Sequence, residues 1–361
     1  MAETRTPYRP DVAVPPGETL LETLVALGMT QADLARRIER PLKTINEIVQ
    51  GKASITPDTA VQLERALGVP AAFWNNLEKN YQEGKARLRA KSQAEMQVRE
   101  VARLPYGDMA KRGWVPRERR PVARVEHALG FFGVSSLAVV PVIEGAAFRK
   151  QHRKPADPWA LAAWLRRGEI EARDRAAAGY SQGAIREQLP SLRSLTLEPP
   201  GVWSRRLVER CAEAGVVVVF VPHLPHTYVH GATRWLGGSR PVIQMSIRGR
   251  YEDIFWFSFF HELGHILLHG KRETFLDGEG TKRTAKESEA DAFAAGTLVP
   301  EPEYASWATR ERFAEAAVRE FARRIDTAPG IVVGRLQHDG RIPRSHLNGL
   351  RRRLTWRRES A

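Results

Sequence analysis

The sequence is poor in cysteine and in long apolar runs. Its 361 residues include a single cysteine, Cys211, which excludes an internal disulfide and a cysteine-rich metal site. No apolar segment approaches the ~18 residues that a membrane-spanning helix needs. No apolar run near the first residue precedes a cleavage site, so we expect no signal peptide and no membrane partner. These absences indicate a protein of the reducing cytoplasm.

Acidic residues are also scarce relative to basic ones. The chain has 42 Asp and Glu against 56 Lys and Arg, which gives a formal net charge of +14. Such an excess favours anionic partners such as nucleic acid, although a solvated basic surface has the same composition. The length predicts two or three domains with substantial cores.

The stretch Phe255 to Gly270, FWFSFFHELGHILLHG, places two histidines and a glutamate in a run that otherwise has the composition of a buried helix. Residues four apart lie on one helix face, so His261 and His265 can offer their imidazoles to one metal ion. Glu262, about 100° further round the helix, can instead deprotonate a water. Chance would produce HExxH roughly once in a hundred chains of this length. The pattern predicts a zinc site with Glu262 as general base.

A catalytic zinc site needs a third protein ligand. The stretch Lys286 to Ala295, KESEADAFAA, predicts a second amphipathic helix that carries candidates. Glu287 can ligate, while Asp291, four residues later, can accept a proton from a ligand histidine. Glu289 is a rival ligand, although it faces away from Asp291. His269, at the end of the first helix, is expected to be a packed histidine or the partner of a ligand rather than a ligand itself.

The N-terminal part predicts a bundle of five short helices. Apolar residues recur at helical spacing from Gly17 to Leu27, and Thr30 and Thr56 are placed to cap the second and fourth helices. The second and third helices flank a tight turn from Glu39 to Pro41, and the fifth spans Ala71 to Tyr81. Two short helices joined by a tight turn inside such a bundle form a helix-turn-helix.

Residues Gly17 to Tyr81 resemble the DNA-binding domain of phage-repressor-like regulators, and among them the HigA-type antitoxins. The stretches TQADLA, TINEIVQGK, ITPDTAVQLERALG and FWNNLE carry this resemblance, and Glu39 departs from it because many relatives have glycine there. The resemblance implies that the third helix enters the major groove of duplex operator DNA. Its exposed readers would be Lys43, Thr44, Asn46 and Glu47, with Gln31 contacting a phosphate or an outer base, and these side chains suit such contacts.

Three β-branched or alternating runs predict a sheet just before the HExxH helix. Residues 215–221 predict a buried strand, and residues 227–236 and 241–247 predict a hairpin around Gly237 to Ser239. A sheet in this place is typical of zincin peptidases, in which an edge strand can pair with an extended peptide.

Residues Val216 to Pro300 resemble the ImmA/IrrE family of metallopeptidases. The stretches VFVPHLPHTYVHGATRWL, HELGHILLHG and ESEADAFAAGTLVP carry the resemblance. It implies that zinc is bound by His261, His265 and Glu287, and that Glu262 is the general base.

These observations predict a multidomain protein in which an all-α, five-helix helix-turn-helix domain precedes a helical linker and scaffold and an α+β zincin-like metallopeptidase domain. The expected divisions are a mobile arm (1–15), the helix-turn-helix domain (16–82), the linker and scaffold (83–200), the metallopeptidase domain (201–310) and a C-terminal helical region with a basic tail (311–361).

Two functions follow from this organisation. The first is a DNA-binding transcriptional regulator whose zinc-dependent endopeptidase domain cleaves or releases a partner protein in stress, phage or toxin–antitoxin control. The alternative is an antitoxin-like repressor whose zincin domain senses or docks without cutting. The expected cofactor is Zn2+, and the expected partners are operator DNA and a protein substrate, repressor or toxin, with a homodimer as one arrangement open to the chain.

Overall fold

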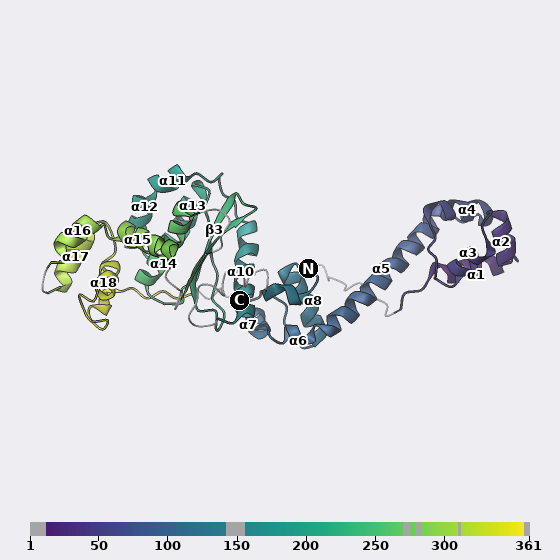
Figure 1. The fold of residues 1–361 in the computed structure, drawn as a ribbon, viewed down its shortest axis with the longest axis horizontal. Helices are drawn as coiled ribbons and strands as arrows, with labels where there is room; N and C mark the ends of the chain where they lie inside the picture. Colours follow the sequence, from purple (N-terminus) through teal and green to yellow (C-terminus); the bar gives the residue numbers. More distant parts are fainter. Residues whose placement is uncertain (1–11, 142–155, 270–274, 279–283, 310–311, 357–361) are drawn as a thin grey trace. The chain divides into compact units, whose positions relative to one another are not determined.

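The computed structural model describes residues 12–141, 156–269, 275–278, 284–309 and 312–356 (Figure 1). The chain divides into two compact units, Met1–Val98 and Arg99–Ala361. The first unit is helical and the second combines helices with a small sheet, which confirms the expected fold class. Residues 1–11 of the expected arm and 357–361 of the basic tail lie outside the described residues.

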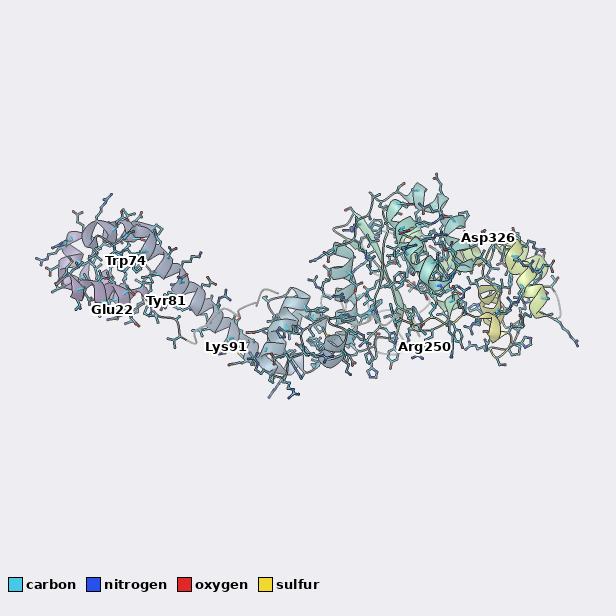
Figure 2. All side chains as sticks on the ribbon, turned by 180° about the vertical axis from the view of Figure 1, so that it is seen from behind. Glu22, Trp74, Tyr81, Lys91, Arg250 and Asp326 are labelled. Carbon is cyan, nitrogen blue, oxygen red and sulfur yellow. The ribbon has the colours of Figure 1, made fainter. Side chains whose placement is uncertain are left out.

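Five helices make up the first unit. They are α1 (Pro16–Ala26), α2 (Gln31–Arg37), α3 (Leu42–Val49), α4 (Pro57–Leu67) and α5 (Ala71–Met96). Each helix contributes a fully buried side chain to one core, and Figure 2 labels the Trp74 of this set. The set consists of Leu20, Leu34, Ile45, Leu63 and Trp74.

The helix starts expected at Thr30 and Thr56 are present. Thr30 Oγ1 accepts a hydrogen bond from Asp33 N at 3.1 Å, and Thr56 Oγ1 accepts one from Thr59 N at 3.2 Å. Between α2 and α3, Glu39 has a φ of 55°, in the left-handed region that favours glycine. The glutamate therefore takes the backbone conformation that a glycine would take, and the tight turn is kept.

Helix α5 is longer than the sequence indicated. It continues past Tyr81 to Met96 and crosses the boundary expected at residue 82. No proline interrupts this stretch, and Glu83 and Arg87, one turn apart, form an ion pair of 2.5 Å. Such pairs stabilise an exposed helix by a few tenths of a kcal/mol each.

From Val98 the chain forms a run of helices before its sheet. These are α6 (Val98–Val101), α7 (Tyr106–Lys111), α8 (Pro121–Phe132), α10 (Pro158–Arg173), α11 (Gln182–Glu187), α12 (Leu189–Ser194) and α13 (Pro200–Glu213). The sheet and the remaining helices follow. They are β1 (Val217–Phe220), β2 (Val229–Leu236), β3 (Arg240–Met245), α14 (Glu252–Leu268), β4 (Phe275–Gly278), α15 (Ala285–Leu298), α16 (Glu301–Trp307), α17 (Glu315–Arg324) and α18 (Pro329–His338).

The sheet has the strand order β1-β3-β2-β4. Strand β1 is parallel to β3, whereas β2 is antiparallel to both β3 and β4. The expected hairpin joins β2 to β3 through Gly237 and Gly238, whose φ values are 57° and 71°. Strand β4 was not predicted, because it is short and follows the HExxH helix rather than preceding it.

Helices cover both faces of the sheet (Figure 1). Ile243 and Met245 of β3 point into the core that contains α14. Gln244, between them, points to the other face, where its Nε2 donates to the Trp164 carbonyl of α10 at 2.7 Å. Gly168 makes this contact possible, because a Cβ there would lie 1.8 Å from the Gln244 amide oxygen. Helix α14 is therefore enclosed by the sheet on one side and by α15 and α18 on others.

The C-terminal segment returns to the first turn of α14. Arg351 donates two hydrogen bonds, of 3.0 and 2.8 Å, to the buried carboxylate of Asp253. Arg352 donates to Glu252 at 3.1 Å, and the backbones of Tyr251 and Arg353 form a β-bridge. Part of the basic tail is thus packed against the second unit. Within the described residues, no helix has both the length and the apolar character to cross a membrane.

Glu252 makes the stability of the second unit depend on pH. Burial raises the pKa of this carboxyl to about 7 from its ordinary value of 4.5, in spite of the nearby Arg352 and the hydrogen bond from Trp203 Nε1 at 3.1 Å. The folded chain therefore holds the proton more tightly than the unfolded chain. The resulting stability is fully present below about pH 4.5 and is lost as the pH rises to about 7, by on the order of 3 kcal/mol.

We expect Glu252→Gln to remove this dependence. The free energy of unfolding, measured in urea at several pH values, should rise in the variant relative to the wild type between about pH 5 and pH 7 and stay constant above that. Glu303→Gln, an exposed change on α16, is the control. A difference between Glu252→Gln and wild type that does not vary with pH would contradict this account.

Candidate metal centre

Helix α14 carries its polar residues through the middle of a hydrophobic core. His261, Glu262 and His265 are 3%, 0% and 1% exposed, and apolar neighbours such as Phe260 and Leu263 are fully buried. A buried polar side chain is costly unless it has a partner, so these three residues require partners from other elements.

Helix α15 supplies the nearest partner. Glu287, which is 4% exposed, lies beside both histidines. Its Oε2 is 3.1 Å from His261 Nε2, and its Oε1 is 3.7 Å from His265 Nε2. One potential ligand atom from each of the three side chains lies within 4.8 Å of the others. The structure therefore brings together the three residues that the sequence indicated as zinc ligands.

This group fits a zinc ion. Two imidazoles and one carboxylate are a donor set of catalytic zinc sites. The Nε2 atoms of His261 and His265 are 3.0 Å apart, close to the roughly 3.3 Å between two nitrogens on one tetrahedral zinc. Glu287 Oε1 is buried and has no hydrogen-bond partner within the described part of the chain. A cation would satisfy that oxygen.

The pKa values of Glu287 and His265 are shifted toward the protonation states in which these side chains bind metals. Burial alone would raise the pKa of Glu287, but the adjacent His261 and His265 outweigh this effect and lower that pKa to about 2. Burial lowers the pKa of His265, against the opposing effect of Glu287. A charged carboxylate and a neutral imidazole are the forms that bind metals.

Each histidine has a partner on its other ring nitrogen. His261 Nδ1 lies 3.0 Å from Asp291 Oδ1, the contact that the sequence suggested. His265 Nδ1 lies 2.9 Å from His269 Nδ1, and His269 Nε2 lies 3.1 Å from Glu289 Oε2. Glu289, the rival ligand in the sequence, thus contacts His269 and is outside the three-residue group. Such contacts orient metal-binding imidazoles and raise their basicity.

Strand β2 passes very close to Glu262. A Cβ atom at Gly231 would lie 2.8 Å from Glu262 Cγ and 3.0 Å from its Oε1. Two residues further along the strand, Thr233 Oγ1 donates to the Glu262 carbonyl at 3.0 Å. The sequence analysis did not single out Gly231, although an isolated glycine inside a strand pattern is a signal for close approach of another group.

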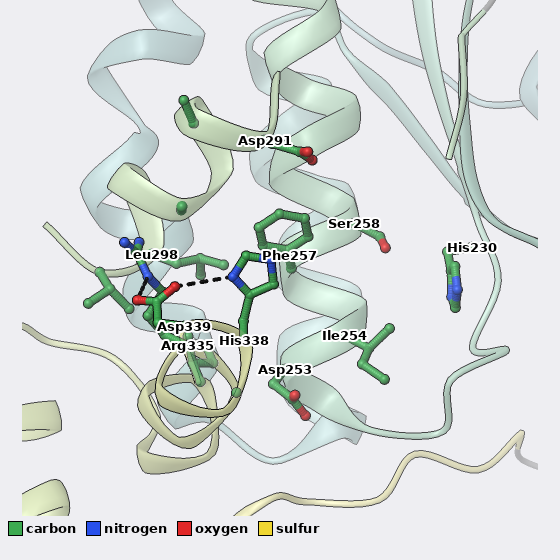
Figure 3. Close-up of a pocket in the computed structure, with 15 residues that line it drawn as sticks. His230, Asp253, Ile254, Phe257, Ser258, Asp291, Leu298, Arg335, His338 and Asp339 are labelled. Atoms are coloured by element: carbon green, nitrogen blue, oxygen red, sulfur yellow. Dashed lines mark hydrogen bonds and ion pairs between the residues drawn. The ribbon is translucent and has the colours of Figure 1, made fainter. Parts of the chain in front are cut away.

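A cavity of about 530 Å3 adjoins this group within the second unit (Figure 3). Asp291, the partner of His261, lines it, so the cavity and the histidines share one side chain. Ser258 of α14 points toward the strand that carries His230 (Figure 3). Apolar side chains, including Ile254, Phe257 and Leu298, line much of the rest.

The residues expected to contact DNA lie in the first unit on α2 and α3. Lys43 is exposed at 86% of its side-chain surface, and its Nζ is 3.8 Å from Glu47 Oε1. Thr44 and Asn46 are half-buried on the same helix. Gln31 begins α2, and its buried Oε1 has no hydrogen-bond partner among the described residues.

Two known families match separate parts of the chain. Residues 20–74 match the helix-turn-helix family, and residues 211–336 match the peptidase family described as IrrE N-terminal-like domain. The first segment contains the residues of α2 and α3, and the second contains His261, Glu262, His265 and Glu287.

Curated relatives match the N-terminal part. The chain is 32% identical over 63 residues to the uncharacterized HTH-type transcriptional regulator YddM of Escherichia coli strain K12, which is 18% of this chain and 67% of that protein. It is 39% identical over 70 residues to virulence-associated protein I of Dichelobacter nodosus, which is 19% of this chain and 65% of that protein. The chain thus spans about two thirds of the length of each of these relatives.

Solved structures match the same part. Pseudomonas aeruginosa antitoxin HigA with the higBA promoter is 32% identical at a TM-score of 0.23, over 24% of this chain and 95% of that chain. An addiction module antidote protein of a HigA family from Coxiella burnetii is 32% identical at a TM-score of 0.22, over 24% of this chain and 94% of that chain. Both sequence resemblances are confirmed, and the chain belongs to the helix-turn-helix family through its N-terminal part and carries an IrrE N-terminal-like domain, of a metallopeptidase-type family, at residues 211–336.

Proposed function

We propose that this chain is a DNA-binding transcriptional regulator whose second unit contains a zinc-dependent endopeptidase that cleaves a partner protein. The observation that carries the proposal is the buried group of His261, His265 and Glu287, with Glu262 on the same helix. In this proposal the peptidase domain comprises residues 201–310 and the DNA-binding domain residues 16–82.

His261, His265 and Glu287 would hold the zinc ion. When bound, zinc supplies a Lewis acid that polarises a peptide carbonyl and makes water easier to deprotonate. The contacts of His261 with Asp291 and of His265 with His269 hold the two rings in their orientations. Because the three side chains are almost fully buried, they would hold the ion in fixed positions and away from bulk water.

Glu262 has a separate role in this proposal. Its carboxylate takes the proton of the attacking water and later gives it to the leaving amine. The buried position limits its movement, because β2 passes at Gly231 and Thr233 binds its backbone carbonyl. A general base held in this way needs no reorganisation when the reaction begins.

The DNA-binding half rests on the family match and on the chemistry of α3. Lys43, Thr44, Asn46 and Glu47 lie on this helix and can contact base edges or phosphates. In this proposal Gln31, at the start of α2, contacts a phosphate or an outer base. The relative in Escherichia coli is named as an HTH-type transcriptional regulator, which supports the same role here.

The purified chain should bind about one zinc ion. We expect His261→Ala and Glu287→Gln to lose it, because each removes a ligand. Glu289→Gln should keep the ion with an affinity lowered about tenfold, since it changes only the partner of His269. Metal analysis and zinc titration measure this, with the exposed Glu303→Gln as control. Retention of zinc by Glu287→Gln and its loss in Glu289→Gln would assign the third ligand to Glu289.

Glu262→Gln should keep zinc and lose peptidase activity. We expect a loss of roughly 10²- to 10⁴-fold in rate, because the base is removed while the ligands stay. New N-termini generated by the zinc-loaded chain in a cell extract, identified by mass spectrometry, measure the activity. In cells, normal control of a reporter by Glu262→Gln, together with loss of control in a Lys43, Thr44, Asn46 triple-alanine variant, would support docking without cleavage.

The full chain should bind duplex DNA with a strong dependence on salt, because bound cationic side chains release counterions from the phosphates. We expect Lys43→Ala to change the preferred sequence in a selection from random duplexes. Lys79→Ala, at an exposed position on α5, is the matched control and should leave the preference unchanged. A chain that binds no duplex even at low salt would contradict the DNA-binding role and favour a first unit that binds protein.

A further inference from the structure

A cluster of basic side chains lies where β1 and β3 end and β2 begins. We define the basic cluster as Arg112, His223, Arg248 and Arg250. Arg112, just after α7, donates from Nη2 to the His223 carbonyl at 3.1 Å. Arg248, just after β3, lies over the ring of Tyr228 at 4.7 Å from its centroid. Two loops, residues 221–228 and 246–251, therefore carry most of the cluster.

The cluster carries the positive charges of its three arginines, whereas His223 is held in its neutral form. Burial lowers the pKa of His223, and the charges of Arg248, Arg112, His230 and Arg250 lower it further. Asp108 lies 3.8 Å from Arg112 and is shared with Lys111 at 3.5 Å, while Arg250, on the second loop, is exposed. A concentration of like charge of this kind stabilises an anion that binds beside it.

The backbone of the same loops is strained. His226, Tyr228 and Arg250 have φ values of 63°, 53° and 56°, in the left-handed region that residues other than glycine rarely occupy. Strained conformations persist only where the surrounding structure holds them, and they gather at binding and catalytic sites. Because strained residues occur on both loops, we infer that the fold fixes the positions of the arginines in the basic cluster.

The basic cluster adjoins the cavity beside the metal-binding group. The two places meet at Ile254, which lines the cavity and packs against Gly249, between Arg248 and Arg250; a Cβ at Gly249 would lie 2.8 Å from Ile254 Cδ1. His230 also lines the cavity, and its carbonyl accepts a hydrogen bond from Ser246 N at 2.7 Å. At His230 the pairing of β2 with β4 shifts register between Val229 and Gly231. Such bulges redirect a side chain. A ligand that reaches both places therefore needs an apolar group and an anionic group close together.

We propose that the cavity and the basic cluster form one docking surface for an acidic segment of a partner polypeptide. An aliphatic side chain enters the cavity against Ile254, Leu298 and Ile331, and neighbouring Asp or Glu carboxylates bind Arg248 and Arg250. A polypeptide fits better than a nucleic acid, because this lining suits an aliphatic side chain. The inference rests on the proposed peptidase function, since it names the class of protein that the site receives.

Binding by the full chain tests the proposal. The probes are a fluorescein-labelled peptide of alternating leucine and glutamate, its leucine–lysine counterpart, and a duplex DNA. Using Glu262→Gln protein keeps the peptides intact, so anisotropy reports binding alone. We expect the glutamate peptide to bind more than tenfold more tightly than the lysine peptide. The double change Arg248→Gln with Arg250→Asn should weaken glutamate-peptide binding about tenfold, and asparagine tolerates the left-handed backbone.

Two controls keep the outcome clear. Arg205→Gln with Arg319→Gln removes the same charge from exposed positions on α13 and α17 and should leave binding unchanged. Arg250→Asn alone serves if the double variant does not fold. Equal binding of the two peptides, or no effect of the cluster variants, overturns the proposal. Loss of duplex binding in the cluster variants, without glutamate-peptide binding by the parent, overturns it in favour of a nucleic-acid surface.

Failure of the proposed peptidase function gives a different result. Wild-type, zinc-loaded protein is incubated with the glutamate peptide and with protein extracts, and products are sought by mass spectrometry. Absence of cleavage together with charge-dependent peptide binding contradicts the peptidase and leaves the docking surface in place. Cleavage that shows no preference for acidic segments, and that the cluster variants do not change, overturns the docking surface alone.

Discussion

The burial of four polar side chains inside an apolar core is the constraint on which the second unit depends. His261, Glu262 and His265 on α14 and Glu287 on α15 are all at most 4% exposed. Groups of this kind are costly to bury unless hydrogen bonds, ion pairs or a metal compensate them. Asp291 and the His269–Glu289 pair compensate the outer sides of the histidines. On their inner side the histidines face Glu287, and the zinc ion of the proposed function would compensate the buried charge there.

The position of α14 follows from contacts at several points along it. Its first turn is held by Arg351 and Arg352, its middle packs against β2 at Gly231, and α15 crosses it at the site. The Arg351–Asp253 pair is largely buried, and removing one partner of such a pair commonly costs about 3 to 5 kcal/mol. Residues nearly a hundred positions away in sequence thus help to place the histidines, and the C-terminal region is part of the site's support.

Local patterns explain which features could be predicted from the sequence. HExxH spacing, the threonine caps and the hairpin turn each depend on residues only a few positions apart, and each places its residues in space through helix or turn geometry. The remaining features depend on long-range packing. Strand β4 exists because β2 offers an edge, and Glu289 turns to His269 because of how two helices cross. The arginine pairs at α14 have no local signal, since a run of arginines is equally compatible with solvent.

Asp291 contacts both the proposed metal-binding group and the cavity in which a partner side chain is proposed to bind. One face of this side chain accepts from His261 Nδ1, and the same residue lines the cavity beside the basic cluster. An occupant of the cavity therefore sits against the residue that orients a metal ligand. The buried group itself offers little basis for choosing among polypeptides, because its side chains contact one another and, in the proposed function, would hold the ion. Selectivity must then come from the surfaces around it, where the charge and shape of the partner can be distinguished.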